Sequence, residues 1–247
     1  DFPTSPLEAY RKKASFDWKK LKSYLYSEEV LEYQKKIYHD LRQHSIFSSP
    51  NFQSRTFQDE RRITAQQMMC LSQLQSLSLS ESLSNIKFPT TKLKILMQLN
   101  PSAAIKNSIS FGMFPSVIQG LGTERHTHYL DKSLECEIIG AYCLTEIGHG
   151  SNAKNLQTVA RYDKNTKEFI LNSPTFEAAK CWAGNLGQIA THAIVYAQLI
   201  TPDGVNHSLH AFVVKIRDPQ TFLPYPGVIV GDMGEKIGLN GLDNGFL

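Results

Sequence analysis

Apolar residues recur at helical spacing through the first 136 residues of the chain. Trp18, Leu21 and Leu25 share one face, with lysines between them, which predicts an amphipathic helix. Ser27 precedes a second predicted helix over residues 28–41, where acids come early and lysines later, the charge order that a helix dipole favours. The first part of the chain is therefore expected to be helical.

Local start and stop signals divide the rest of this helical part. A capping pattern at residues 56–59 opens a helix directed toward Leu77. Residues 77–84 alternate leucine and serine. This period is that of a strand, but the position between helices favours a helix end or a loop, and both interpretations stay open. Asn100-Pro101 and Pro115 are expected to break or kink the helices that follow.

From Glu137 the pattern changes to short strands separated by turn signals. The alternation over 209–217 is typical of a half-buried antiparallel strand. The expected strands are 138–144, 156–162, 168–172, 189–200 and 209–217. Strands at this spacing predict a small antiparallel β-barrel. The predicted fold class is therefore α+β, with an all-α helical domain over 1–136 and a β-barrel domain over 137–247.

Composition narrows the range of functions. The chain has 247 residues and a net charge of +3, which is close to balanced and does not indicate nucleic-acid binding. No apolar run reaches the length of a membrane span. The four cysteines lack CxxC spacing and are expected to be reduced thiols of an intracellular protein. The pair Arg61-Arg62 is interpreted as a solvated face, and His126-x-His128 is not expected to bind metal, because residues two apart on a helix face apart.

Residues Tyr142 to Asn152 contain the most informative stretch of the chain. An apolar run leads into Thr145-Glu146 and then a loop with Gly148, Gly150 and Ser151. Such a loop offers unhindered backbone N–H groups and small hydroxyls to a planar, acceptor-rich ligand or a phosphate. On composition alone, a simple glycine-rich turn at the end of a strand is the favoured interpretation.

A second segment, Lys180 to Asn185, changes this picture. It places Trp182 two residues before Gly184, ahead of the strand predicted over 189–200. A large aromatic side chain beside a bare backbone position gives a flat heterocycle one face to pack on and an N–H within reach. The two segments together predict a binding site for a planar ring.

These two motifs resemble the middle domain of the acyl-CoA dehydrogenase and acyl-CoA oxidase superfamily. The motif Thr-Glu-Ile-Gly-His-Gly-Ser is similar to that of the oxidase branch, because dehydrogenases tend to have Pro and Ala at the positions of Ile147 and His149. Further stretches resemble peroxisomal acyl-CoA oxidases, and 173–180 and 217–221 lean toward the branched-chain (pristanoyl-CoA) type. The resemblance is close from Gly120 to Leu247 and looser before it.

The resemblance implies non-covalent FAD and a fatty acyl-CoA, oxidised by O2 to trans-2-enoyl-CoA and hydrogen peroxide in the peroxisome. By position, Thr145 corresponds to the residue at the flavin pyrimidine edge and Gly184 to the one near flavin N5. Trp182 is expected to pack near the ring, with Gly148 and Gly150 in the cofactor loop, and Ser151 to contact the cofactor or the CoA arm. Each of these residues also has a structural explanation as a turn or core residue.

The resemblance also implies parts that this chain does not contain. The family has its catalytic base in a C-terminal helical bundle, so the base is expected beyond Leu247 and Glu146 is not assigned that role. The chain is thus expected to be a fragment, inactive alone and poor at binding FAD, whose full-length form is a homodimer. Two alternatives stay open: an acyl-CoA dehydrogenase that uses an electron-transfer flavoprotein, and a non-catalytic acyl-CoA-binding scaffold.

Overall fold

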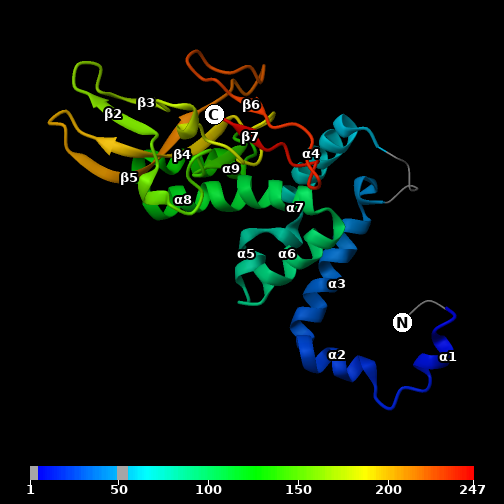
Figure 1. Ribbon diagram of the computed structural model, residues 1–247. Helices are drawn as coiled ribbons and strands as arrows, with labels where there is room; N and C mark the ends of the chain where they lie inside the picture. Colours follow the sequence, from blue (N-terminus) through cyan, green and yellow to red (C-terminus); the bar gives the residue numbers. More distant parts are fainter. Residues whose placement is uncertain (1–4, 49–54) are drawn as a thin grey trace. The chain divides into compact units, whose positions relative to one another are not determined.

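The computed structural model describes residues 5–48 and 55–247, and these form two compact units. Unit 1 consists of Asp1–Ser48 with Leu74–Ile95, and unit 2 of Ser49–Gln73 with Leu96–Leu247. Figure 1 labels the helices and strands of both units. Each unit is described by itself below.

Unit 1 is helical, as predicted. Its helices are α1 (Glu8–Arg11), α2 (Trp18–Tyr26), α3 (Glu28–Arg42), α5 (Leu79–Leu83) and the first part of α6 (Phe88–Leu99). Helix α3 contributes Val30, Tyr33, Ile37 and Leu41 to the core, and the ring of Tyr33 stacks on Phe88 with centroids 4.0 Å apart. The leucine–serine run that the sequence left open is the short helix α5.

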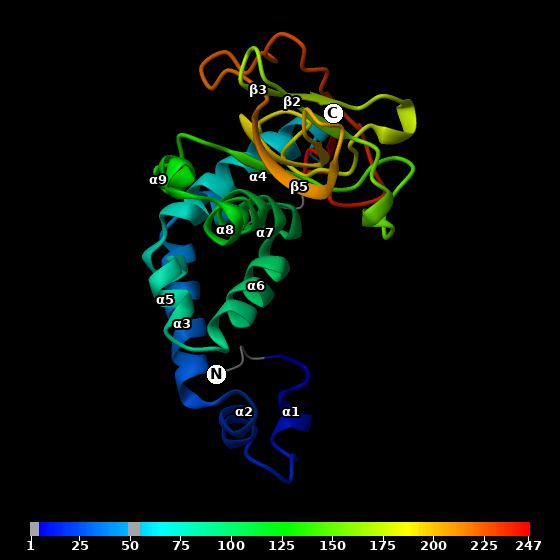
Figure 2. The ribbon, with the colours of Figure 1, turned by 90° about the vertical axis from the view of Figure 1, so that its left-hand side faces the viewer.

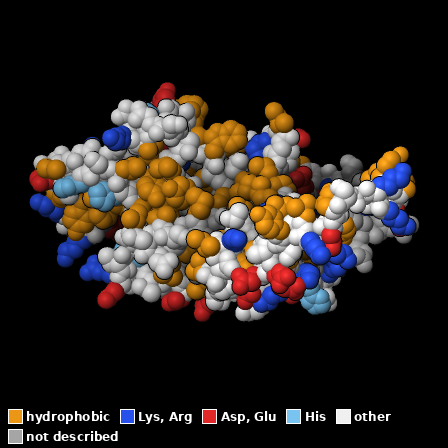
Figure 3. Space-filling model, turned by 90° about the horizontal axis from the view of Figure 1, so that it is seen from below, with side chains coloured by type: hydrophobic (Ala, Val, Ile, Leu, Met, Phe, Trp, Pro, Cys, Tyr) orange, Lys and Arg blue, Asp and Glu red, His pale blue; other side chains and the backbone are white. Residues whose placement is uncertain are grey.

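Helix α2 has the amphipathic pattern that the sequence predicts but buries none of its residues among those described. Asp17 caps it, accepting hydrogen bonds from the backbone N–H groups of Lys19 and Lys20. Hydrophobic side chains therefore remain on the surface, among them Tyr24 at 86% exposure and Leu25 at 64%. Figure 3 shows, in orange, that hydrophobic side chains form several patches on one face of the molecule.

The helical part of unit 2 begins with α4 (Phe57–Gln73), which starts where the capping pattern predicts. The Asp59 N–H donates to Thr56 Oγ1 at 3.1 Å. Asn100 ends α6 and caps α7 (Pro101–Ser108). A π-helical turn (Ile109–Met113) then leads into α8 (Phe114–Leu121), and α9 (Thr127–Leu134) completes the helices of this part.

The sheet of unit 2 is mixed and open, so the predicted antiparallel β-barrel is wrong. Its strands are β1 (Gly140–Cys143), β2 (Val159–Asp163), β3 (Glu168–Asn172), β4 (His192–Ile200) and β5 (Asn206–Lys215). The central strand β4 pairs in parallel with β1 and β2 and antiparallel with β5, while β2 and β3 form an antiparallel hairpin. Among the described residues the pairing runs β1-β4-β2-β3, with β5 on β4, and does not close.

The physical reason for this error lies in what periodicity encodes. Alternation shows that a segment is a strand, but it does not identify its partner or the direction of pairing. Strand β1 reaches β4 by a crossover that contains the whole β2–β3 hairpin, and a long crossover is what parallel neighbours require.

Helix α8 covers one face of this sheet, as Figure 2 shows. Phe114 and Ile118 pack there with Ile138 and Ile194, all buried. A Cβ atom on Gly140 would lie 2.4 Å from Phe114 Cγ, so glycine at this position permits the close approach of helix and strand. Helices give way to strands between Leu134 and Gly140, and the domain boundary placed near Cys136 remains a prediction.

Two short strands follow the sheet, β6 (Gly231–Asp232) and β7 (Gly245–Phe246), and they pair antiparallel. A bridge between Ala183 and Gly245 joins β7 to the segment that carries Trp182. The last residues of the chain are thereby fixed against the candidate site.

Candidate functional site

The strand-end loop after β1 is a tight turn that uses several of its own N–H groups. Glu146 and His149 bond each other through their backbones, at 3.0 and 3.1 Å. The Gly148 N–H donates to Glu177 O at 2.9 Å. Gly150 and Ser151 are exposed, and the space beside Gly150 is open. Open room for a ligand in this loop therefore lies at Gly150 and Ser151.

The loop lies beside the tryptophan segment. The Cys181 N–H donates to Thr145 O at 3.0 Å, so half-buried Thr145 is bonded to the residue next to Trp182. The Trp182 backbone has φ of 59°, in the left-handed region, and its N–H donates to Met233 Sδ at 3.3 Å. The indole is 58% exposed. A large aromatic ring is thus presented to solvent by a constrained backbone.

Trp182 also borders a cavity of about 770 Å³ with mostly apolar walls. Strands β3, β4 and β5, the 227–233 segment and the last two residues of the chain line it, together with Ile147 and Cys181. Of the six predicted site residues, Trp182 is the one in this wall. A hollow of this size and character is typical of small-molecule sites.

Gly184 has a packing explanation. It is buried, and a Cβ atom there would lie 2.5 Å from Ile109 Cδ1 and 3.0 Å from Leu242 Cδ1. A side chain at this position would make the ends of the Ile109 and Leu242 side chains shift. The glycine thus lets these two side chains approach the backbone closely, whether or not a ligand binds.

Comparisons with known proteins agree with these motifs. The profile of the acyl-CoA dehydrogenase middle domain matches residues 141–247. Human peroxisomal acyl-coenzyme A oxidase 3 is 42% identical over 247 residues, which is 100% of this chain and 35% of that protein. The chain belongs to the acyl-CoA dehydrogenase and oxidase superfamily. The chain spans about a third of the length of the curated relatives it matches.

Solved oxidase structures resemble this superfamily member throughout. Acyl-CoA oxidase 1 of Yarrowia lipolytica covers 97% of the chain with a TM-score of 0.88 and 28% identity, over 35% of its own chain. Acyl-CoA oxidase-1 of Caenorhabditis elegans, solved in complex with FAD and ATP, covers 97% with a TM-score of 0.80 and 31% identity, over 36% of its own chain. The resemblance that the sequence motifs indicate is confirmed.

Glu146, the residue next to Thr145, is engaged in a buried hydrogen-bond network. Its carboxylate accepts from Thr158 N and Oγ1, at 2.8 and 2.6 Å, from Gln157 N at 2.8 Å and from Lys180 Nζ at 3.0 Å. Burial alone would raise the pKa of Glu146, but the hydrogen bonds from Thr158, Gln157 and Lys180 outweigh it and hold that pKa below its ordinary value. An ionised carboxylate so fully bonded holds the fold together, which agrees with leaving it out of the catalytic roles.

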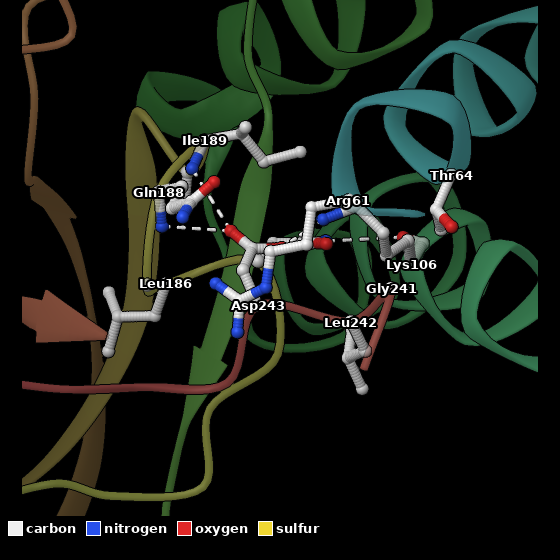
Figure 4. Close-up of polar contacts among 12 residues, drawn as sticks. Arg61, Thr64, Lys106, Leu186, Gln188, Ile189, Gly241, Leu242 and Asp243 are labelled. Atoms are coloured by element: carbon white, nitrogen blue, oxygen red, sulfur yellow. Dashed lines mark hydrogen bonds and ion pairs between the residues drawn. The ribbon is translucent and has the colours of Figure 1, made fainter. Parts of the chain in front are cut away.

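A second buried network was missed by the sequence analysis, and Figure 4 draws it. Lys106 of α7 forms an ion pair with Asp243, and the side chains of both are 2% exposed. Burial lowers the pKa of the Lys106 ammonium, and Asp243 beside it limits the drop. Lys106 and Asp243 are far apart in sequence, so no local pattern predicts that they pair. The sequence feature that could have pointed to Asp243 is the Gly-Leu-Asp-Asn-Gly motif at 241–245.

Arg61 belongs to the same region, and its assignment to a solvated face is wrong. Its side chain is 3% exposed and forms an ion pair with Asp232, while its Nε donates to Asn240 O at 3.1 Å. Arg62, by contrast, is 62% exposed, as expected. A hollow of about 140 Å³ beside the network is bordered by both arginines, Lys106 and Asp243.

Three further findings concern the part of the chain that the structure describes. It contains no group of three or more His, Cys, Asp or Glu residues that could hold a metal ion. None of its helices is both long enough and apolar enough to cross a membrane. The four cysteines are free thiols there, with Cys143 and Cys181 buried.

Proposed function

We propose that this chain is part of a FAD-dependent acyl-CoA oxidase of peroxisomal fatty-acid β-oxidation, which converts an acyl-CoA and O2 into a trans-2-enoyl-CoA and hydrogen peroxide. Similarity over the whole chain to peroxisomal acyl-CoA oxidases supports the reaction and the compartment. A relative solved with FAD supports the cofactor.

The observation that carries the proposal is the exposed indole of Trp182 beside Thr145. A ring that is 58% exposed on a constrained backbone is a ready platform for a flat heterocycle. FAD, when bound, would supply the acceptor for the β-hydrogen of the substrate. Thr145 and Trp182 would hold and orient the ring, with contributions at the neighbouring predicted positions Gly148, Gly150, Ser151 and Gly184.

We assign no residue of this chain as the catalytic base. Glu146 already accepts bonds from Lys180, Thr158 and Gln157, and its place in the fold is buried. We propose that the base is supplied outside these 247 residues, that the natural protein is a homodimer, and that the helical and strand-rich parts are separate domains meeting near Cys136.

The test uses the protein at its natural length, purified and mixed with a long-chain acyl-CoA without oxygen. Bleaching of the visible flavin band, followed by fast recovery and peroxide formation in air, is the expected result. Bleaching that persists in air would indicate a dehydrogenase that uses an electron-transfer flavoprotein. Absence of flavin would overturn the proposal and favour a non-catalytic acyl-CoA-binding scaffold.

The role of Trp182 has its own test. Trp182→Ala should weaken FAD binding by about tenfold or more, since stacking on an exposed indole contributes on the order of 1–3 kcal/mol. Trp18→Ala is the matched control, because Trp18 is the other tryptophan and lies in α2. Equal FAD affinities in the two variants would remove Trp182 from the site.

A further inference from the structure

The segment that follows Trp182 is held between two buried groups of opposite charge. On one side the Asp243 carboxylate accepts from the N–H groups of Gln188 and Ile189, at 2.8 and 3.2 Å. Figure 4 shows these bonds from Asp243 to the two backbone nitrogens. Asp243 is 1% exposed, so its charge acts in a region of low dielectric.

Arg217 stands on the carbonyl side of the same turn. Its Nη1 donates to Leu186 O at 2.8 Å and to Ala190 O at 3.2 Å, and its Nη2 donates to Gly187 O at 3.0 Å. Arg217 is 4% exposed. A turn whose N–H groups face an anion and whose carbonyls face a cation is stabilised at both ends of its dipole.

The backbone is unusual where it enters this turn. Trp182 has φ of 59°, and left-handed backbone at such a bulky residue costs on the order of 1–3 kcal/mol. Asn185, fully buried with φ of 67°, is of a residue type that tolerates this conformation. The Asn185 amide adds a third anchor, donating to Ser110 Oγ at 3.0 Å and to Gly140 O at 3.2 Å.

Asp243, which holds the turn from one side, is connected directly to the residues of the candidate flavin site. Ala183, between Trp182 and Gly184, exchanges two backbone hydrogen bonds with Gly245, at 2.9 and 3.3 Å. Gly245 lies two residues after Asp243, which Lys106 fixes to α7. A shift of Asp243 would therefore move the backbone on which Trp182 is mounted.

We propose that Asp243 and Arg217 are positioning residues for the cofactor, which hold the turn over residues 185–190 so that Trp182 and Gly184 meet the flavin in a fixed geometry. This inference rests on the proposed function, because it assumes that a flavin packs against Trp182. Neither residue needs to touch the cofactor: each acts through the backbone.

The test compares Asp243→Asn with Asp232→Asn in the protein at its natural length, with Trp18 and every tryptophan outside these 247 residues replaced by phenylalanine so that Trp182 alone reports. Both variants replace a carboxylate of the 231–247 segment, but Asp232 accepts from Arg61 and from the Gly234 N–H. FAD affinity is measured by quenching of Trp182 fluorescence, and the Gln188 and Ile189 amides by hydrogen exchange. The thermal unfolding of both variants is also measured, so that their FAD affinities can be compared at known stabilities.

Asp243→Asn should weaken FAD binding about tenfold, equivalent to about 1.4 kcal/mol, and change the maximal quenching, with faster exchange of both amides. Asp232→Asn should change FAD affinity by less than about twofold at a comparable loss of stability. If Asp243 had only a structural role, both variants would lose stability, and the maximal quenching of Trp182 by FAD would be the same in the two.

If Asp243→Asn does not fold, Arg217→Lys replaces it, since lysine keeps the charge but cannot donate to three carbonyls in the same fork geometry. Unchanged FAD affinity and quenching in the folded variant would overturn this inference alone. A parent protein that binds no FAD would overturn the proposed function first and the positioning role with it.

Discussion

Glu146 and Asp243 are two buried carboxylates that perform the same structural task in different surroundings. Each accepts from two consecutive backbone N–H groups of a loop and pairs with one buried lysine. Glu146 receives in addition the Thr158 hydroxyl, whereas the lysine of Asp243 comes from a helix 137 positions earlier in the chain. The first carboxylate fixes a loop within the sheet region, and the second ties a loop to the helical layer of unit 2.

The comparison indicates that a lysine counter-ion contributes more to stability where the carboxylate has fewer other hydrogen-bond donors. A buried charge that keeps several hydrogen-bond donors loses less when its lysine is removed than one with few. The two sites therefore predict different costs for the same substitution.

Lys106→Met is expected to have the largest effect. It leaves Asp243 with two N–H donors in the interior, and breaking a buried ion pair from one side costs about 3–5 kcal/mol. Urea unfolding of wild type and variant measures this loss. A change below about 1 kcal/mol would show that Asp243 has no need of its counter-ion.

Lys180→Met should destabilise the protein less, by about 3 kcal/mol or under, because Glu146 retains its bonds from Gln157 and from Thr158 N and Oγ1. The same unfolding assay applies. Lys36→Met is the matched surface control, since Lys36 pairs with Glu81 at 2.8 Å with 46% of its side chain exposed, and should cost about 0–1 kcal/mol. A larger loss in Lys180→Met than in Lys106→Met would reverse the comparison.

The smallest effect concerns pH. Because the pKa of Glu146 lies below its ordinary value of 4.5, its contribution to folding is complete above that pH and is lost as pH falls through the folded-state pKa. The Lys180 ammonium and the His149 ring lie beside the carboxylate, at 3.0 and 3.2 Å. Unfolding free energies from pH 7 to 3 should therefore decline less steeply in Glu146→Gln than in wild type. If the unfolding free energies of the two proteins fell in parallel with pH, Glu146 would not contribute to the loss of stability in acid.

Local signals explain the parts of the fold that the sequence predicts well. The Thr56 hydroxyl and the Asn100 amide cap α4 and α7 by bonds to N–H groups two or three residues away, so the pattern is complete within one turn of chain. The β2–β3 hairpin is likewise local, with five residue pairs around one turn. Parallel pairing of β1 with β4 depends on contacts some fifty residues apart, and periodicity carries no information on it.

The candidate site divides in the same way. Thr145 and Trp182 are found from motifs, and the structure brings their segments together through the Cys181 N–H. Arg61 and Arg62 are neighbours of the same type, about 100° apart around a helix, and only a partner 171 residues away decides that Arg61 is the buried one. Asp243 was missed because its donors lie on α7 and on the turn after Trp182, far along the chain.

The π-helical turn over Ile109–Met113 stores one extra residue in the helical layer. A wide turn between α7 and α8 holds one residue more than an α-helical path would need. Deleting one residue there would leave a regular helix and keep the residues after it on their present faces. Phe114 would thus keep its place against Gly140, whereas the backbone around Ser110, whose hydroxyl donates to Gly140 O, would be rebuilt.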